Sequence, residues 1–335
     1  MTDTNEAGAT PANSPVDKPG NAILPRPSIG VARLASRTLL RVTGPGTVAF
    51  LQGQFSQHLD DVSETRAPRA AASTPKGRAY ALARLYRLGD DVLVDLPTAL
   101  ADDVLGRLRK YLMLFRGTTM APVDGAMVWG LIGEDAARAL DAAATEALAA
   151  PGDARTLAAG VLIRVEPDDR GVSRYQFWQL PAAGADAPNW GALPRLEEAD
   201  WAASEIAAGI PELSPRTQEA FVPQMLNWQH LGGVHFRKGC YTGQEVIARM
   251  HFLGQLKKSL ARFSAPMPVD PEAPIQSGDR TVGDLITQVR FADGSAELLA
   301  VIRHDALDQS LAIAGTSLTR QPLPYAVPEQ AAADT

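Results

Sequence analysis

The chain has 335 residues, of which 45% are hydrophobic and 21% are charged, so it can bury a core and form two or three domains. Its single cysteine excludes an internal disulfide framework, and it excludes a four-thiolate zinc or iron–sulfur site built by this chain alone. The net charge of −6 argues against a general nucleic-acid binder, so we expect no direct contact with nucleic acid.

The start of the chain predicts neither an anchor nor a leader. No apolar run reaches the length of a membrane span, and the first residues lack the basic and apolar regions of a signal peptide. We therefore expect a cytoplasmic protein without a membrane partner. Residues 1–28 are rich in Ala, Pro, Thr and Asn without periodicity, which predicts a disordered tail.

The first structured stretch predicts a strand at residues 39–42, a turn, and a helix at residues 48–52. A pair of strands follows at residues 79–88 and 92–96. Lys76 and Arg78 flank a glycine just before this pair, where two cations can meet an anion at a sheet edge. The alternative is that they are solubilising charges in a turn.

The middle of the chain alternates helices and strands, which indicates an α+β or α/β region. Apolar residues at helical spacing predict a helix over residues 98–115, and an Ala-rich stretch predicts another over residues 134–150. A further helix is predicted at residues 201–208. Strands are expected at residues 127–132, 161–165 and 175–180.

The pattern changes after Gly254. Short strands separated by Pro, Gly and Asp turns are predicted at residues 258–264, 281–291, 297–303 and 310–313. A small antiparallel β-barrel is the natural closed form for such strands. A second tail is expected from residue 328 onward.

The lone cysteine, Cys240, lies in the stretch RKGCYTGQEVIARMH at residues 237–251. Thr242 and Glu245 have the spacing of a capping box, which predicts a helix that starts at Gly243, just after the cysteine. The nearby helix N-terminus and two cations favour thiolate, the form that attacks electrophiles and binds soft metals. The alternative is a small buried hydrophobe.

Cations gather around this cysteine. Between residues 232 and 258 there is a single acid, Glu245, against five cations, which are Arg237, Lys238, Arg249, Lys257 and Lys258. Such a patch could serve an anionic ligand, or it could be a solvated face. His235 and His251 are close in sequence, so a Cys–His nucleophile pair for thiol-dependent hydrolysis or transfer stays open. The histidines form no HxH or HExxH pair, the spacings that would predict a zinc site.

The segment KGCYTGQE, residues 238–245, resembles the signature of the YgfZ family, folate-binding relatives of the glycine-cleavage T-protein that are linked to iron–sulfur clusters. Residues 42–54, the PKGR segment at 75–78 and the GIP corner at 209–211 are similar to family segments in the same order. The resemblance implies an α+β, T-protein-like multi-domain folate-binding fold. It implies two α/β subdomains around a central cavity over residues 29–254, a barrel over 255–327 and a tail over 328–335.

The resemblance also implies a function. We expect a folate-binding accessory protein for iron–sulfur cluster assembly or repair that affects tRNA modification indirectly. Its cofactor would be tetrahydrofolate or a one-carbon derivative, and its partners would be cluster-assembly proteins or client cluster enzymes. Cys240 would be the reactive residue. The expected folate contacts are a basic entrance of Lys76, Arg78, Lys238 and Arg249, with Gln224, Asn227, Tyr241 and Gln244 at the ring.

The chain departs from its relatives at two points. In aminomethyltransferases an aspartate follows the glycine loop, whereas Ala79 and Tyr80 follow it here. Ala207 replaces an acidic residue that many relatives carry two places before Gly209. The missing aspartate counts against aminomethyl transfer, which remains an alternative activity. If the acidic residue of the relatives contacts the ligand, Ala207 removes that contact.

Overall fold

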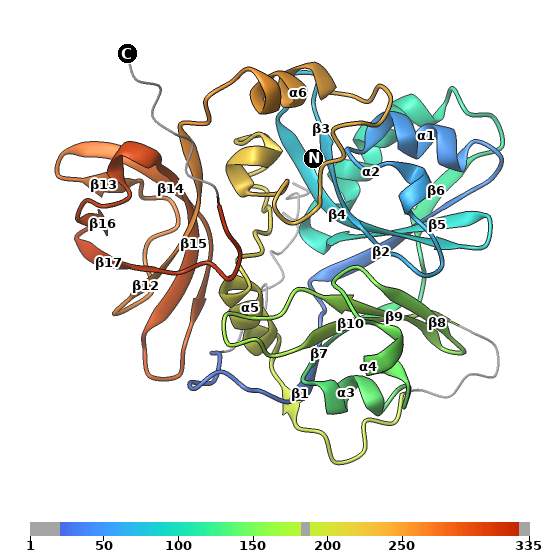
Figure 1. Ribbon diagram of the computed structural model, residues 1–335, viewed down its shortest axis with the longest axis horizontal. Coiled ribbons are helices and arrows are strands. Elements are labelled where there is room, and N and C mark those ends of the chain that lie inside the picture. Colours follow the sequence, from blue (N-terminus) through green and yellow to red (C-terminus); the bar gives the residue numbers. More distant parts are fainter. Residues whose placement is uncertain (1–20, 182–187, 328–335) are drawn as a thin grey trace, which may run out of the picture.

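Three sheets organise the protein (Figure 1). The computed structural model describes residues 21–181 and 188–327. A five-stranded sheet, a six-stranded sheet and a closed six-stranded barrel occupy separate regions, as the mixed α+β prediction requires. Within the described ranges no helix has the length and apolar character needed to cross a bilayer.

The five-stranded sheet has the order β3-β4-β5-β2-β6 and is antiparallel throughout. Helix α2 buries Leu100, Val104 and Leu108, residues four apart that share one face. The predicted strands and helices are confirmed, but β3 and β6 were missed because β3 is Ala-rich and β6 is short and ends in proline. The elements are β2 (Arg37–Thr43), α1 (Thr47–Gln54), the 3₁₀ turn η1 (Leu59–Asp61), β3 (Arg69–Ser73), β4 (Ala79–Leu88), β5 (Asp91–Pro97), α2 (Thr98–Leu112) and β6 (Thr119–Pro122).

The six-stranded sheet has the order β11-β1-β7-β10-β9-β8, and only the β1–β11 pair is parallel. The prediction of one helix over residues 134–150 is wrong, because two short helices, α3 and α4, occupy this stretch. Asp141 accepts a hydrogen bond from the backbone N–H of Ala143 at 3.1 Å, a local bond that competes with a continuous helix. The elements are β1 (Gly30–Arg33), β7 (Met127–Ile132), α3 (Glu134–Arg138), α4 (Ala144–Ala147), β8 (Ala154–Leu157), β9 (Gly160–Val165), β10 (Arg174–Gln179), β11 (Arg195–Leu196) and α5 (Glu198–Ala207).

Helix α5 crosses this sheet at unusually close range. A Cβ on Gly130 of β7 would lie 2.3 Å from the Trp201 ring of α5, so only glycine permits this packing. A capping box between Glu197 and Asp200 fixes the start of the helix. The close approach brings Glu198 and Glu205 toward the centre of the molecule.

The predicted C-terminal barrel is confirmed, with the closed order β12-β15-β14-β13-β16-β17. A register shift between Leu285 and Thr287 in β14 interrupts the ladder with β15, as a β-bulge does. Strands β13 and β17 were missed because β13 has three residues and β17 buries none. The elements are β12 (Lys258–Ala265), β13 (Ile275–Ser277), β14 (Arg280–Arg290), β15 (Ala296–Arg303), the 3₁₀ turn η3 (His304–Ala306), β16 (Leu311–Ile313) and β17 (Thr316–Gln321).

The predicted disordered tail over residues 1–28 is wrong for residues 21–28. Residues 1–20 and 328–335 lie outside the described residues, but residues 21–28 pack against the body. Ala22 is fully buried and its N–H donates to Arg290 O at 2.9 Å, while Ile23 N–H donates to Asp200 Oδ1 at 2.6 Å. The prediction from composition therefore placed the start of the folded region several residues too late.

Candidate functional site

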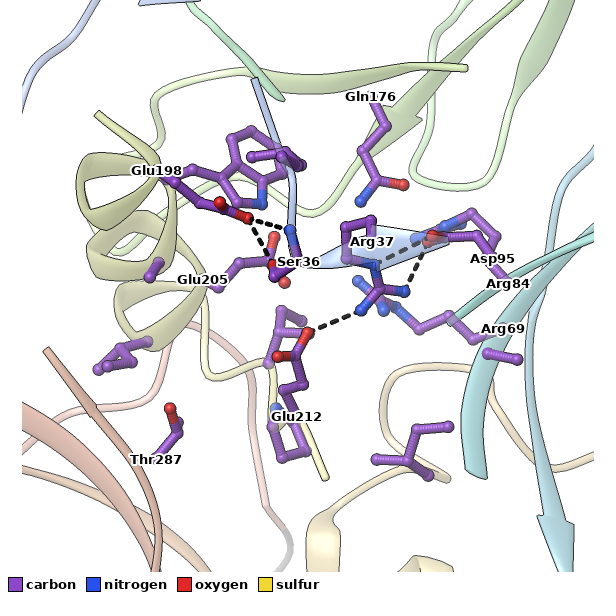
Figure 2. A pocket seen from close by; sticks show the side chains of 18 of the residues that line it. Ser36, Arg37, Arg69, Arg84, Asp95, Gln176, Glu198, Glu205, Glu212 and Thr287 are labelled. Carbon is purple, nitrogen blue, oxygen red and sulfur yellow. Dashed lines mark hydrogen bonds and ion pairs between the residues drawn. The ribbon is translucent and has the colours of Figure 1, made fainter. Parts of the chain in front are cut away.

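A cavity of about 100 Å³ lies where the two sheets, helix α5 and the barrel meet (Figure 2). Each part of the fold contributes to its wall. The polar residues used below are Arg37 from β2, Arg69 from β3, Arg84 from β4, Gln176 from β10, Glu205 from α5 and Thr287 from β14.

Arg37 occupies the centre of this wall. Its Nε and Nη2 donate to the two carboxylate oxygens of Asp95 at 3.0 and 2.7 Å, and its Nη1 donates to Glu212 at 2.7 Å. Bidentate pairing of this kind fixes both position and orientation. Arg37 therefore ties the five-stranded sheet to the chain corner that follows Gly209.

A second ion cluster adjoins the cavity, because Arg69 and Arg84 line it. Arg69 Nε and Nη2 donate to Glu166 at 2.9 and 2.5 Å, and the nearly buried Arg84 approaches the same carboxylate at 3.4 Å. Burial alone would raise the pKa of Glu166, but Arg69 and Arg84 outweigh it and lower this pKa to about 2. The buried charges are thus paired, which is the condition for their presence in an interior.

Some polar groups on the cavity wall keep capacity for a ligand. Gln176 Oε1 accepts from Trp178 at 3.3 Å, while the Gln176 amide nitrogen donates to no group in the described part of the chain. Glu205 uses one oxygen for Arg174 at 2.6 Å. Figure 2 shows the Gln176 side chain reaching from β10 toward Arg37. Glu198, by contrast, is occupied by Ala35 and Ser36.

Cys240 is free and exposed, and it lies in a loop packed between α1 and α6 (Gln244–Phe252). The predicted capping box is wrong: Gly243 is the N-cap, no side chain caps the helix, and Glu245 faces solvent. The reason is the backbone. Gly243 has φ 86°, and a Cβ there would lie 2.5 Å from Thr74 O, so the loop turns tightly against the neighbouring PKGR loop.

Lys238 is not part of a basic entrance, contrary to the sequence prediction. It is 5% exposed, and its Nζ donates to Gln52 O, Phe55 O and Gln57 O at 2.7, 2.6 and 2.8 Å. Gln52 O is one of the carbonyls that the end of α1 leaves without a helical partner. Burial lowers the pKa of Lys238 to about 7, while the three carbonyl contacts favour the charged form.

The ring contacts expected in the same loop are also used internally. Tyr241 is 9% exposed, and the centroid of its ring lies 4.8 Å from Lys238 Nζ. Burial raises the pKa of Tyr241 to about 12. Gln244 Oε1 accepts from Tyr241 N–H at 3.3 Å. Of the four cations expected at the entrance, Lys76 and Arg249 face solvent, and Arg78 donates to Ala220 O at 2.5 Å.

Gln224 and Asn227, expected at the folate ring, link structural elements through their amide nitrogens, while Gln224 Oε1 and Asn227 Oδ1 are buried without a hydrogen-bond partner in the described part of the chain. Gln224 Nε2 donates to Ile247 O of α6 at 2.7 Å, and Asn227 Nδ2 donates to Leu260 O of the barrel at 3.1 Å. Both residues belong to the segment around the 3₁₀ turn η2 (Pro223–Leu226). None of the nine residues expected at the site lines the cavity.

The cavity residues escaped the sequence analysis because no motif joins them. A signal did exist: Arg84 and Asp95 are charged residues inside otherwise apolar buried strands, which is unusual unless the charges are paired. Their partners, however, come from distant segments. The sequence alone could not connect them.

The geometry does not support a Cys–His nucleophile pair. His235 Nδ1 accepts from Arg237 N–H at 3.3 Å, and the His251 ring is stacked on Phe236 with ring centroids 3.6 Å apart. Among the described residues no hydrogen bond joins Cys240 to either histidine. A general base must lie within hydrogen-bond reach of its nucleophile, so this alternative lacks its central contact.

Replacing Lys238 with methionine removes all three hydrogen bonds to the carbonyls at and beyond the end of α1. We expect Lys238→Met to lower the free energy of unfolding by about 2–4 kcal/mol, because buried acceptors lose their partners. Denaturant titration measures this change. The exposed neighbour provides the control, since Arg237→Met should change stability by less than about 0.5 kcal/mol. Equal stability of both variants would contradict the assigned role of Lys238.

The depressed pKa of Glu166 predicts acid sensitivity. Its folded pKa of about 2 lies below the unfolded value of about 4.3, so the stabilisation is complete above that value and is lost as pH falls toward 2. Between pH 5 and 2, wild type should lose about 2–3 kcal/mol more than Glu166→Gln. The exposed Glu146→Gln should behave like wild type. Denaturant titration across this range tests it, and parallel curves for wild type and Glu166→Gln would refute the pairing.

Comparison with known proteins places this geometry in a family. No family model matches the chain. The "tRNA-modifying protein YgfZ" of Yersinia pseudotuberculosis (strain IP 31758) is 30% identical over 305 residues, covering 87% of this chain and 91% of the relative. The protein of the same name from Edwardsiella ictaluri is 30% identical over 312 residues, with the same coverage.

A solved structure supports the fold. The crystal structure of glycine cleavage system aminomethyltransferase T from Bartonella henselae has a TM-score of 0.66 at 15% identity, covering 89% of this chain and 86% of that one. The likeness confirms the expected T-protein-like fold and shows nothing beyond the fold. Because the curated relatives match at 30% identity over nearly their whole length, this chain belongs to the YgfZ family.

Proposed function

We propose that this cytoplasmic protein binds a reduced folate in its central cavity and, through Cys240, supports the assembly or repair of iron–sulfur clusters. Its effect on tRNA modification would be indirect, through the cluster enzymes that modify tRNA. The name of its relatives, tRNA-modifying protein YgfZ, supports the link to tRNA modification, and its T-protein-like fold supports a folate site. The observation that carries the proposal is the polar cavity at the meeting point of the sheets and the barrel.

The cavity suits the ring of a folate better than the whole molecule. The volume of about 100 Å³ is well above the roughly 10–15 Å³ that admits one water, and well below the roughly 300–1,000 Å³ of pockets that bury a drug-sized ligand. A pterin is flat and carries donors and acceptors along one edge. The free amide nitrogen of Gln176 and the carboxylates of Glu205 and Glu212 offer complementary groups. The glutamate tail of the folate would extend out of the cavity.

The thiol acts at a separate place in this proposal. Cys240 is exposed and does not line the cavity, so it is accessible to another protein. We propose that the Cys240 thiol reacts with or binds a cluster or a persulfide that a partner protein carries. The folate would bind elsewhere in the same fold. Aminomethyl transfer is not proposed, because Ala79 and Tyr80, which begin β4 after the PKGR loop, supply no carboxylate.

Titration with tetrahydrofolate in a calorimeter tests the cavity. We expect one binding site, and we expect Gln176→Leu to weaken binding about tenfold, the cost of a lost hydrogen bond near 1.4 kcal/mol. The exposed Gln276→Leu on the barrel should bind like wild type. Absence of binding by wild type, or equal binding by Gln176→Leu, would count against this site.

Complementation tests the thiol. In a strain that lacks the protein, Cys240→Ser should restore neither cluster-enzyme activity nor the modified nucleosides of tRNA, because a hydroxyl replaces the soft sulfur ligand. Mass spectrometry of digested tRNA gives the readout. Ser317→Ala, exposed on β17, should restore both. Full restoration by Cys240→Ser would remove the cysteine from the mechanism while leaving folate binding untouched.

A further inference from the structure

Two apolar side chains stand out from the turn that follows α2. Met113 and Leu114 are 79% and 80% exposed, whereas the flanking Leu112 and Phe115 pack against the core. The turn is held by backbone bonds from Leu114 N–H to Tyr111 O at 3.1 Å and from Phe115 N–H to Leu112 O at 2.9 Å. The outward position of both side chains is therefore set by an anchored turn.

Helix α1 continues this apolar surface. A Cβ on Gly46, which precedes α1, would lie 2.8 Å from Phe115 Cβ, so the start of α1 packs against the turn. Val48 in the first turn of α1 is 38% exposed, and the sequence of the helix, TVAFLQGQ, contains no charged residue. Small, uncharged side chains on an exposed helix permit close approach of another surface.

Cations border the apolar residues. Arg109 and Lys110 precede the turn and Arg116 follows it, all three exposed. In residues 21–181 and 188–327 none of them has an ion-pair partner. They give this surface a local positive charge on a chain whose net charge is −6. A surface of this kind complements one that is apolar at its centre and acidic around it.

The surface lies one helix length from Cys240. Lys238 and Thr242 bind carbonyls at the far end of α1, with Thr242 N–H donating to Gly53 O at 3.0 Å. Eight helical residues span about 12 Å. A protein seated over the α2 turn and α1 would therefore reach the thiol.

We propose that Val48, Met113 and Leu114, bordered by Arg109, Lys110 and Arg116, form a docking surface for an acidic partner protein. A protein fits these features better than RNA, because aliphatic Met and Leu side chains offer no ring on which bases stack. It also fits better than a bilayer, since a bilayer brings no group to the neighbouring thiol. The docking surface does not depend on folate binding, and its link to Cys240 rests on the proposed function.

Site-specific photo-crosslinking in the native host tests the surface. A photoreactive amino acid replaces Leu114 in the full chain, and a control chain carries it at Met267, which is 56% exposed on the barrel. We expect a discrete protein adduct at position 114 that is absent at position 267. The partner, identified by mass spectrometry and purified, should be acidic. Absence of a protein adduct specific to position 114, or an adduct with RNA, lipid or a second copy of this chain, overturns the proposal.

Calorimetry with the purified partner completes the test. Leu114→Asp and Arg116→Glu should each weaken binding at least tenfold, and added salt should weaken it further. Met267→Asp should bind like wild type, and all variants should keep their affinity for tetrahydrofolate. Equal partner binding by Leu114→Asp overturns the docking surface. If wild type does not bind tetrahydrofolate, the cavity assignment is refuted and the docking result still stands.

Discussion

The buried ammonium of Lys238 holds together the part of the protein that carries Cys240, its single cysteine. It donates to three carbonyls at and beyond the end of α1, and the backbone of Thr242 donates to the next carbonyl, Gly53 O. These bonds satisfy acceptors that a helix C-terminus otherwise leaves to water. The loop that presents Cys240 is thereby built as the cap of α1, and its geometry depends on that helix.

The centre of the molecule depends on a different balance of charges. Arg37, Arg69 and Arg84 line a small cavity and pair directly with the acids beside it. These acids are Asp95, Glu166 and Glu212, and they come from both sides of the contact between the sheets and from the corner after Gly209. Removing one member of such a cluster leaves an uncompensated charge in the interior. The same pairing that keeps the sheets in place also gives the cavity its polar wall. The same residues therefore stabilise the contact between the sheets and line the proposed ligand site.

Sequence patterns predicted the elements far better than the site. Strand β7 was predicted at its observed bounds because its apolar run is short and well bounded, and α2 was predicted because its apolar residues repeat at helical spacing. Lys238 was taken as solvent-facing because adjacent cations look alike in sequence, and only tertiary contacts decide which one is buried. Arg37 and Glu212 are far apart along the chain. No local pattern could pair them.

One short segment connects the cavity with the cysteine loop. Trp228 lines the cavity, and Arg69 lies over its ring at 5.2 Å. Four residues earlier, Gln224 is bonded to the carbonyl of Ile247 in α6, the helix that follows Cys240. A ligand that presses on Trp228 would act on the same segment that holds α6. Coupling between distant sites requires a contiguous physical connection with two arrangements, and η2 provides the connection. The cavity and the cysteine loop are thus separate in space but share one structural support. Under the proposed function, this support would join the folate site to the thiol.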